Sequence, residues 1–250
     1  MKHLPKINIF YWALILSANT MGETAGDLIS QTFNLGYGGG TIALFTLFLI
    51  AFTISIYSKK QKPLLYWTVI TLSSTAGTTI SDYISRSFFH LQLNFTENQG
   101  YTFGTIILIV ALTITFSIWK YHSKANIIEN GISKRSEFLY WIAILTSSTL
   151  GTAFGDLLAH NTPLGFDGGT LLLLVLLTVL VGLVYLTTIS REILYWIGII
   201  LTHPIGATMG DYLTKPEGMN LGNVNASLVL LVVFIVVIVT GQWAKNKQLN

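Results

Sequence analysis

Long apolar segments alternate with short polar ones along the whole chain. Eight segments have roughly the 20 or so mostly apolar residues that a helix needs to cross a bilayer; they are 9–29, 41–58, 65–85, 103–119, 138–158, 170–189, 193–213 and 226–243. The even-numbered segments are almost purely aliphatic, as from Leu171 to Leu177, whereas the odd-numbered ones carry polar residues and glycine. The pattern predicts an all-α polytopic membrane protein with about eight transmembrane helices, in which odd and even helices have different roles.

The composition agrees with a membrane protein. Only 10% of the 250 residues are charged and 52% are hydrophobic, whereas soluble domains carry about 25% charged residues. A water-soluble fold of this size could not hide so much apolar surface. The chain has no cysteine, which excludes disulfides and thiolate metal sites.

The odd segments repeat one another. Each opens with a Tyr-Trp pair, an aspartate follows each Trp by 15 residues, and a pair of small residues four apart precedes each aspartate. The aspartates are Asp27, Asp82, Asp156 and Asp211, and the small residues are Gly22, Gly26, Gly77, Ser81, Gly151, Gly155, Gly206 and Gly210. Four such patterns in register indicate four copies of a two-helix unit. The first segment is therefore not a cleaved signal peptide, because its pattern recurs three times.

The copies also form two halves. The segment from Leu35 to Thr41 matches that from Leu164 to Thr170, and both lie at the same distance from an aspartate. We expect two duplicated halves, residues 1–125 with helices 1–4 and residues 126–250 with helices 5–8. Because each unit has two spans, all copies enter the membrane in the same direction, as parallel repeats about an axis along the membrane normal.

Lysine and arginine gather on one side of the predicted spans. Twelve of the fourteen lie there, and only Arg86 and Lys215 lie on the other side. The positive-inside rule then places both termini in the cytoplasm. The tryptophans of the Tyr-Trp pairs are expected to be anchors at the cytoplasmic interface: Trp12, Trp67, Trp141 and Trp196.

A polar stripe runs along each odd helix toward its aspartate. Positions four apart share a helix face, so the residues 7, 11 and 15 after each Trp lie together: Asn19, Glu23, Asp27; Ser74, Thr78, Asp82; Ser148, Thr152, Asp156; His203, Ala207, Asp211. The small residues border this face and are expected to be packing positions. Polar side chains in a membrane face the bundle interior, so the odd helices should surround a carboxylate-lined core inside an apolar jacket.

This core favours cation transport. Acidic groups inside a membrane are costly and commonly mark a pathway, which predicts a cation path of Asp27, Asp82, Asp156, Asp211, Glu23, Asn19 and His203. Pro204 leaves the carbonyl of Ile200 without its helical donor, next to His203. Oxygen ligands suit Mg²⁺, Mn²⁺, Ca²⁺, Na⁺ or protons, and the imidazole adds Mn²⁺, Fe²⁺ or Zn²⁺. The hypothetical metal ligands are Asp27, Glu23, Asp156 and His203.

The leading hypothesis is a transporter or exporter of a divalent metal such as manganese, or a proton-coupled one, with no cofactor other than the transported cation. One alternative is a structural or regulatory membrane protein, including a homo-oligomer, that associates through its GxxxG faces. An intramembrane metal-dependent enzyme is the weakest alternative, because the metalloprotease, nucleophile-elbow and P-loop motifs are absent. The partners expected are the lipid bilayer and a small cation, and no nucleic acid, since the basic residues are scattered over short loops.

The repeated Tyr-Trp pair and the closing Gly-x-x-x-Gly-Asp resemble a family of uncharacterised bacterial multi-pass inner-membrane proteins. The segment from Gly22 to Asp27 is most similar to that family. Ser81 and Pro204 depart from the pattern in the second and fourth copies. The resemblance implies a fold and a location, and it brings no activity.

Overall fold

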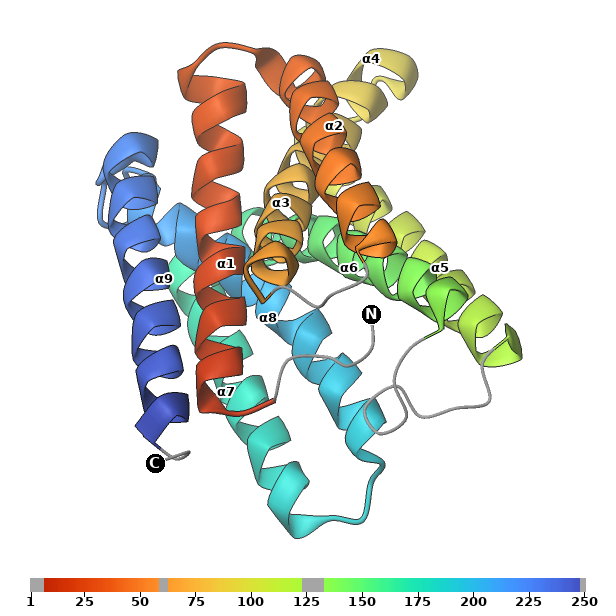
Figure 1. The fold of residues 1–250 in the computed structure, drawn as a ribbon. Coiled ribbons are helices and arrows are strands. Elements are labelled where there is room, and N and C mark those ends of the chain that lie inside the picture. Colours follow the sequence, from red (N-terminus) through yellow and green to blue (C-terminus); the bar gives the residue numbers. More distant parts are fainter. Residues whose placement is uncertain (1–6, 59–62, 123–132, 248–250) are drawn as a thin grey trace.

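A computed structural model describes residues 7–58, 63–122 and 133–247 of the chain, all as helices and short connections without a strand. Each predicted span corresponds to one long helix (Figure 1). The long helices are α1 (Ile9–Asp27), α2 (Gly36–Tyr57), α3 (Pro63–Asp82), α5 (Glu97–His122), α6 (Lys134–Asn161), α7 (Gly165–Leu186), α8 (Arg191–Thr214) and α9 (Gly222–Lys247). Two π-helical segments, η1 (Leu28–Thr32) and η2 (Tyr83–Phe88), extend α1 and α3, and the short α4 (Phe89–Leu93) follows η2.

Local sequence signals set several helix ends. The side chain of Asn8 accepts a hydrogen bond from the backbone N–H of Tyr11, at 3.0 Å, and so caps α1. Ser133 caps α6 in the same way. Three outer helices begin at a glycine with positive φ, namely Gly36, Gly165 and Gly222, a conformation that glycine adopts without steric cost.

The odd-numbered predicted spans, α1, α3, α6 and α8, form the centre of the molecule. They pack in a closed ring in chain order, because α1 contacts α3, α3 contacts α6, α6 contacts α8, and α8 contacts α1. The small residues lie at these contacts: Gly22 and Gly26 against α3, Gly77 against α6, Gly151 and Gly155 against α8, and Gly206 and Gly210 against α1. Ser81, the remaining packing position, is fully buried. The close approach of the four backbones therefore takes place within this chain.

Each outer helix packs on the inner helix of the next copy. Thus α2 lies on α3, α5 on α6, α7 on α8, and α9 on α1, which it accompanies along its length in Figure 1. In three outer helices, a hydroxyl near the helix start forms a hydrogen bond with the neighbouring inner helix. The acceptor belongs to the residue that lies 12 positions after the Trp of that inner helix. These bonds join Thr41 to the Thr79 carbonyl, Thr170 to the Thr208 hydroxyl and Ser227 to the Thr24 hydroxyl, at 2.8, 2.8 and 3.0 Å.

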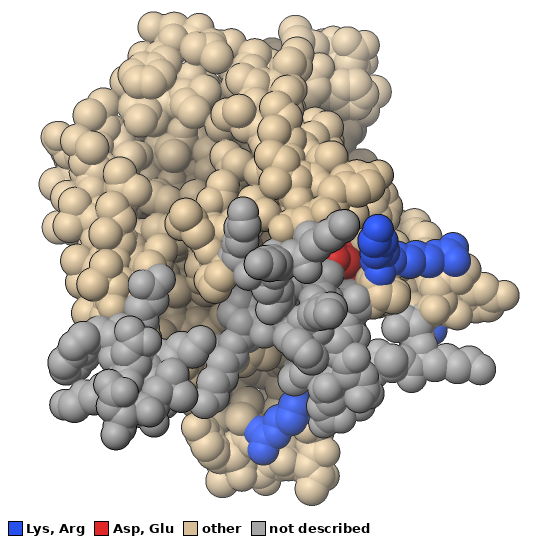
Figure 2. All heavy atoms as spheres, viewed as in Figure 1, with Lys and Arg blue, Asp and Glu red and all other residues tan. Residues whose placement is uncertain are grey.

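Six helices of the described residues are long and apolar enough to cross a membrane: α2, α5, α6, α7, α8 and α9. The outer helices among them expose many large apolar side chains, and Figure 2 shows a broad face without charged residues above the grey-covered part. Helices α1 and α3 are not among the six. The structure thus shows an all-helical, membrane-type chain with six helices suited to cross a membrane, and the number of eight crossings stays a prediction.

Some sequence predictions fall outside the described residues. The boundary between the halves, at 125/126, lies there. The same is true of Lys2, Lys6, Lys59, Lys60, Lys62 and Lys124, half of the basic residues used to predict the orientation.

Candidate cation site

The four tyrosines of the Tyr-Trp pairs meet at one end of the inner ring. Their hydroxyls form a closed cycle of hydrogen bonds, with oxygen–oxygen distances of 3.0, 2.8, 3.1 and 2.8 Å in the order Tyr11, Tyr66, Tyr140, Tyr195 and back to Tyr11. All four side chains are buried. Each hydroxyl can donate once and accept once in such a cycle, so the phenols satisfy one another. We call this set the tyrosine ring.

The predicted interface anchors lie mostly inside the bundle. Trp67, Trp141 and Trp196 are buried, and Trp12 is partly buried. Trp141 packs on the neighbouring Tyr66, with ring centroids 5.5 Å apart. The tryptophans therefore wedge between helices around the tyrosine ring, and an anchoring role at the membrane surface remains a prediction.

The four aspartates lie toward the opposite end of the same helices. Asp27 and Asp82 are the last residues of α1 and α3, and Asp156 and Asp211 lie in the last two turns of α6 and α8. All four are at most 4% exposed. Since all four inner helices carry their tyrosine at one end and their aspartate at the other, they run in the same direction.

Two basic side chains pair with the aspartates across helix boundaries. The guanidinium of Arg86 contacts Asp82 at 3.0 Å and Asp156 at 3.3 Å, joining α3 to α6. The ammonium of Lys215 contacts Asp27 at 2.6 Å and Asp211 at 3.4 Å, joining α8 to α1. These are the two residues that stood apart in the charge distribution of the sequence.

Sequence reasoning missed this role, although the signal was present. Arg86 and Lys215 each follow an aspartate by four residues, the spacing that puts two side chains on one helix face. The same position in the other copies holds Gln31, which donates to Asp27 at 2.5 Å, and His160, whose Nε2 lies 3.9 Å from Asp156. The position four residues after the aspartate thus provides a polar or basic partner for an aspartate in all four copies.

Both basic groups remain charged in this setting. Burial alone would lower the pKa of Arg86, but the carboxylates of Asp156 and Asp82 outweigh it and raise the pKa above its ordinary value. The pKa of Lys215 is raised as well, since the attraction of Asp211 and Asp27 exceeds the cost of burial. The ring of Tyr101, whose centroid is 5.3 Å from the Arg86 guanidinium carbon, adds a cation–π contact.

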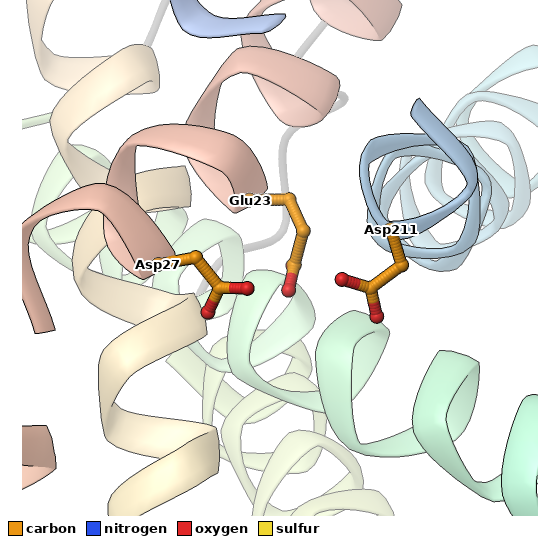
Figure 3. A group of neighbouring side chains, drawn as sticks. All are labelled: Glu23, Asp27 and Asp211. Atoms are coloured by element: carbon orange, nitrogen blue, oxygen red, sulfur yellow. The ribbon is translucent and has the colours of Figure 1, made fainter. Parts of the chain in front are cut away.

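Glu23 lies one helical turn deeper than Asp27. One of its carboxylate oxygens accepts hydrogen bonds from the hydroxyls of Thr78 and Thr152, at 3.0 and 2.9 Å. In Figure 3, Glu23, Asp27 and Asp211 point toward one another, and an oxygen from each lies within 4.8 Å of the other two. All three are buried. We call these three residues together the carboxylate group. This group differs from the predicted metal ligands, because it includes Asp211 in place of Asp156 and His203.

The acids outnumber the bases at this end of the bundle. The described residues place five buried carboxyl groups here, those of Glu23 and the four aspartates, beside two permanently cationic side chains. If every carboxyl group were ionised, five negative charges would face two positive ones and leave an excess of three. Uncompensated buried charge is strongly unfavourable, so the site favours additional cations or protons.

Asn19, Ser74, Ser148 and His203 form a level deeper still, eight residues before the aspartates. The side-chain amide nitrogen of Asn19 donates to the Thr202 hydroxyl at 3.2 Å, and the Ser74 hydroxyl donates to the backbone carbonyl of Asn19 at 3.4 Å. His203 is 6% exposed and its ring nitrogens have no hydrogen-bond partner in the described part of the chain. The predicted path residues therefore occupy three successive levels between the aspartate end and the tyrosine ring.

Comparison with known proteins identifies the repeat. A family model described as a repeat of unknown function, DUF347, matches residues 10–61, 65–125, 139–190 and 194–247. No curated protein and no solved structure matches the chain. Each matched segment covers one inner helix and the outer helix that follows it. The chain therefore belongs to the DUF347 repeat family and carries four copies of its repeat.

Proposed function

We propose that the chain is a cation transporter with eight membrane crossings, built as four parallel two-helix repeats in two duplicated halves. It would lie in the cytoplasmic membrane with both termini in the cytoplasm, in the orientation predicted from its lysines and arginines. Cations would bind at the carboxylate group of Glu23, Asp27 and Asp211 and move along the axis of the inner helices.

One observation carries this proposal. Three carboxylates from α1 and α8 converge within 4.8 Å at a buried position, although the nearby bases are too few to neutralise the acids. Carboxylate oxygens are the preferred ligands of divalent cations such as Mg²⁺, Mn²⁺ and Ca²⁺. In this arrangement Lys215 acts as a tethered cation that an arriving metal ion displaces from Asp27 and Asp211.

The alternative based on GxxxG association is less well supported. The glycines that would receive a partner helix are already covered by neighbouring inner helices, as Gly77 is by Ser148 and Gly206 is by Asn19. A partner or a second copy would have to use the apolar outer helices instead. An enzymatic role gains no support from the sequence, which lacks the metalloprotease, nucleophile-elbow and P-loop motifs.

Metal flux into liposomes tests the proposal. Purified protein is reconstituted with a metal-sensitive dye inside, and Mn²⁺, Mg²⁺, Ca²⁺ and Zn²⁺ are added outside in turn. We expect flux of at least one metal with the wild-type chain and its loss in Glu23→Gln, which removes the deepest carboxylate of the group.

Glu97→Gln is the matched control, because Glu97 is an exposed side chain at the start of α5 and should transport normally. Equal flux from Glu23→Gln and the wild type would refute the carboxylate path. Absence of flux for every metal would refute transport of divalent cations.

A further inference from the structure

Each inner helix places one residue with a buried, unpartnered polar atom at the same level of the inner ring. These atoms belong to residues six or seven positions after a Trp: Asn19 Oδ1, Ser73 Oγ, Ser147 Oγ and both ring nitrogens of His203, none of which has a hydrogen-bond partner in the described part of the chain. Each of these residues is at most 6% exposed. We call this set the inner polar level; it lies about 12 Å from the aspartates along the helices, at 1.5 Å per residue over eight residues.

Such a concentration calls for a ligand. Buried polar groups in folded proteins nearly always have a partner, because a buried group left without one is strongly unfavourable. The inner polar level also gains an acceptor from α8, because Pro204 has no N–H to donate to the carbonyl of Ile200. The level therefore offers an imidazole nitrogen, an amide oxygen, hydroxyl oxygens and a backbone carbonyl.

The kind of donor distinguishes this level from the carboxylate group. It has no carboxylate, and His203 supplies the only imidazole among the inner-helix residues 6 and 7 positions after each Trp. An imidazole nitrogen suits Mn²⁺, Fe²⁺, Co²⁺ and Zn²⁺, whereas Mg²⁺, Ca²⁺ and alkali ions prefer oxygen alone. The ligands at this level therefore discriminate among cations that the carboxylates alone would accept.

We infer that the inner polar level is a second cation subsite that takes a divalent transition metal, with His203 as its nitrogen ligand and Asn19 as an oxygen ligand. The inference rests on the proposed function and narrows its substrate class. Glu23 is the member of the carboxylate group nearest to this level, one turn from Asn19 on the same face of α1. A metal ion leaving Glu23 would next meet these neutral ligands, which lie toward the tyrosine ring.

Electron paramagnetic resonance of bound Mn²⁺ tests the inference. With Mn²⁺ added to the purified full-length protein in nanodiscs, we expect a hyperfine coupling to an imidazole nitrogen. The coupling should disappear in His203→Gln and persist in His160→Gln, which alters the histidine beside Asp156, and in His90→Gln, which alters an exposed one. It should also persist at saturating Mn²⁺ in Glu23→Gln, whose carboxylate group is impaired.

Folding of each variant is checked by gel filtration and by the fluorescence of the buried tryptophans, and His203→Asn serves as a second variant if His203→Gln fails. Bound Mn²⁺ without nitrogen coupling in the wild type would overturn the inference, as would coupling that survives both His203 changes. The liposome assay keeps the two hypotheses apart. Flux without nitrogen coupling would sustain transport and refute the subsite, whereas nitrogen coupling without flux would sustain the subsite and refute transport.

Discussion

The closed ring of inner helices depends on glycines that allow backbones to touch, and Gly206 provides the sharpest test. A Cβ at this position of α8 would lie 2.5 Å from the Asn19 Cβ, 2.7 Å from the Asn19 carbonyl carbon and 2.9 Å from the Thr20 nitrogen. Two of these three atoms belong to the backbone of α1, so a change of rotamer cannot relieve the overlap. Ordinary contacts of a Cβ begin at 3.4 Å, so Gly206→Ala requires α1 and α8 to separate by about 1 Å.

The magnitude follows from two opposing terms. Inserting a methyl group into a well-packed interior costs about 1–3 kcal/mol, while alanine favours a helix over glycine by about 1 kcal/mol. Gly182 on α7 provides the matched control, because a Cβ there meets nothing within 4 Å. Gly182→Ala gains the higher helix propensity of alanine without a steric overlap of the new Cβ. The difference between the two variants thus isolates the packing term, about 1–3 kcal/mol in favour of Gly182→Ala.

Thermal unfolding in detergent, followed by tryptophan fluorescence, measures this difference. For a chain of this length each kcal/mol shifts Tm by about 2–4 °C, so Gly206→Ala should melt about 2–12 °C below Gly182→Ala. Flux in liposomes should fall in the same variant, because Asn19 and Glu23 lie on the displaced face. Equal melting temperatures for the two variants would refute the close packing of α1 on α8.

Three further predictions concern the polar contacts. Tyr66→Phe removes a hydroxyl that joins two others in the tyrosine ring and should destabilise the protein by about 1–3 kcal/mol in thermal unfolding. Lys215→Met should lower Tm. The difference in Tm from the wild type should stay constant from about pH 7 to pH 10, because the pKa of Lys215 is raised in the folded protein and the stabilisation by its ion pairs is fully present below the ordinary pKa of about 10.4. Ala153→Thr should raise Tm by supplying a partner for the buried hydroxyl of Thr105, a gain of about 1 kcal/mol.

Each of these predictions has a control and an outcome that would contradict it. Tyr185→Phe alters an exposed phenol and should be neutral, so equal losses from both changes would argue against the ring. Lys120→Met changes an exposed lysine, and a matching deficit there would show that the ion pairs of Lys215 contribute nothing specific. A lower Tm for Ala153→Thr would mean that position 153 has no room for the hydroxyl contact that Thr24 and Thr208 make in two other copies.

Much of the fold could be predicted because the repeat shows which residues of the four inner helices correspond to one another. The spacing from Trp to Asp placed the stripe residues at common levels, and the small residues marked the contacts between inner helices. The sequence could not tell which helices are neighbours, since any order of four similar faces would bury them.

The candidate site was predicted less completely. The carboxylates were identified, but their partners were not, because Arg86 and Lys215 were interpreted only as exceptions to the charge bias. Comparison of the copies four residues beyond each aspartate would have found them. The tyrosine ring was missed for a different reason: Tyr beside Trp at the end of a span is typical of an interface anchor, and only the three-dimensional arrangement shows that the hydroxyls meet.

The residues that differ among the four copies indicate where the proposed cation site lies better than the residues that the copies share. The tyrosines and aspartates are the same in all four repeats, so they define the framework of the ring. The residues that differ most lie on or directly after the first and last inner helices, with Asn19 and Glu23 on α1, His203 on α8 and Lys215 directly after α8. These helices are far apart in sequence and become neighbours only when the ring closes. Both proposed subsites therefore combine residues of the first and last repeats, and a chain lacking its last repeat would lose Asp211 and His203 and with them both proposed subsites.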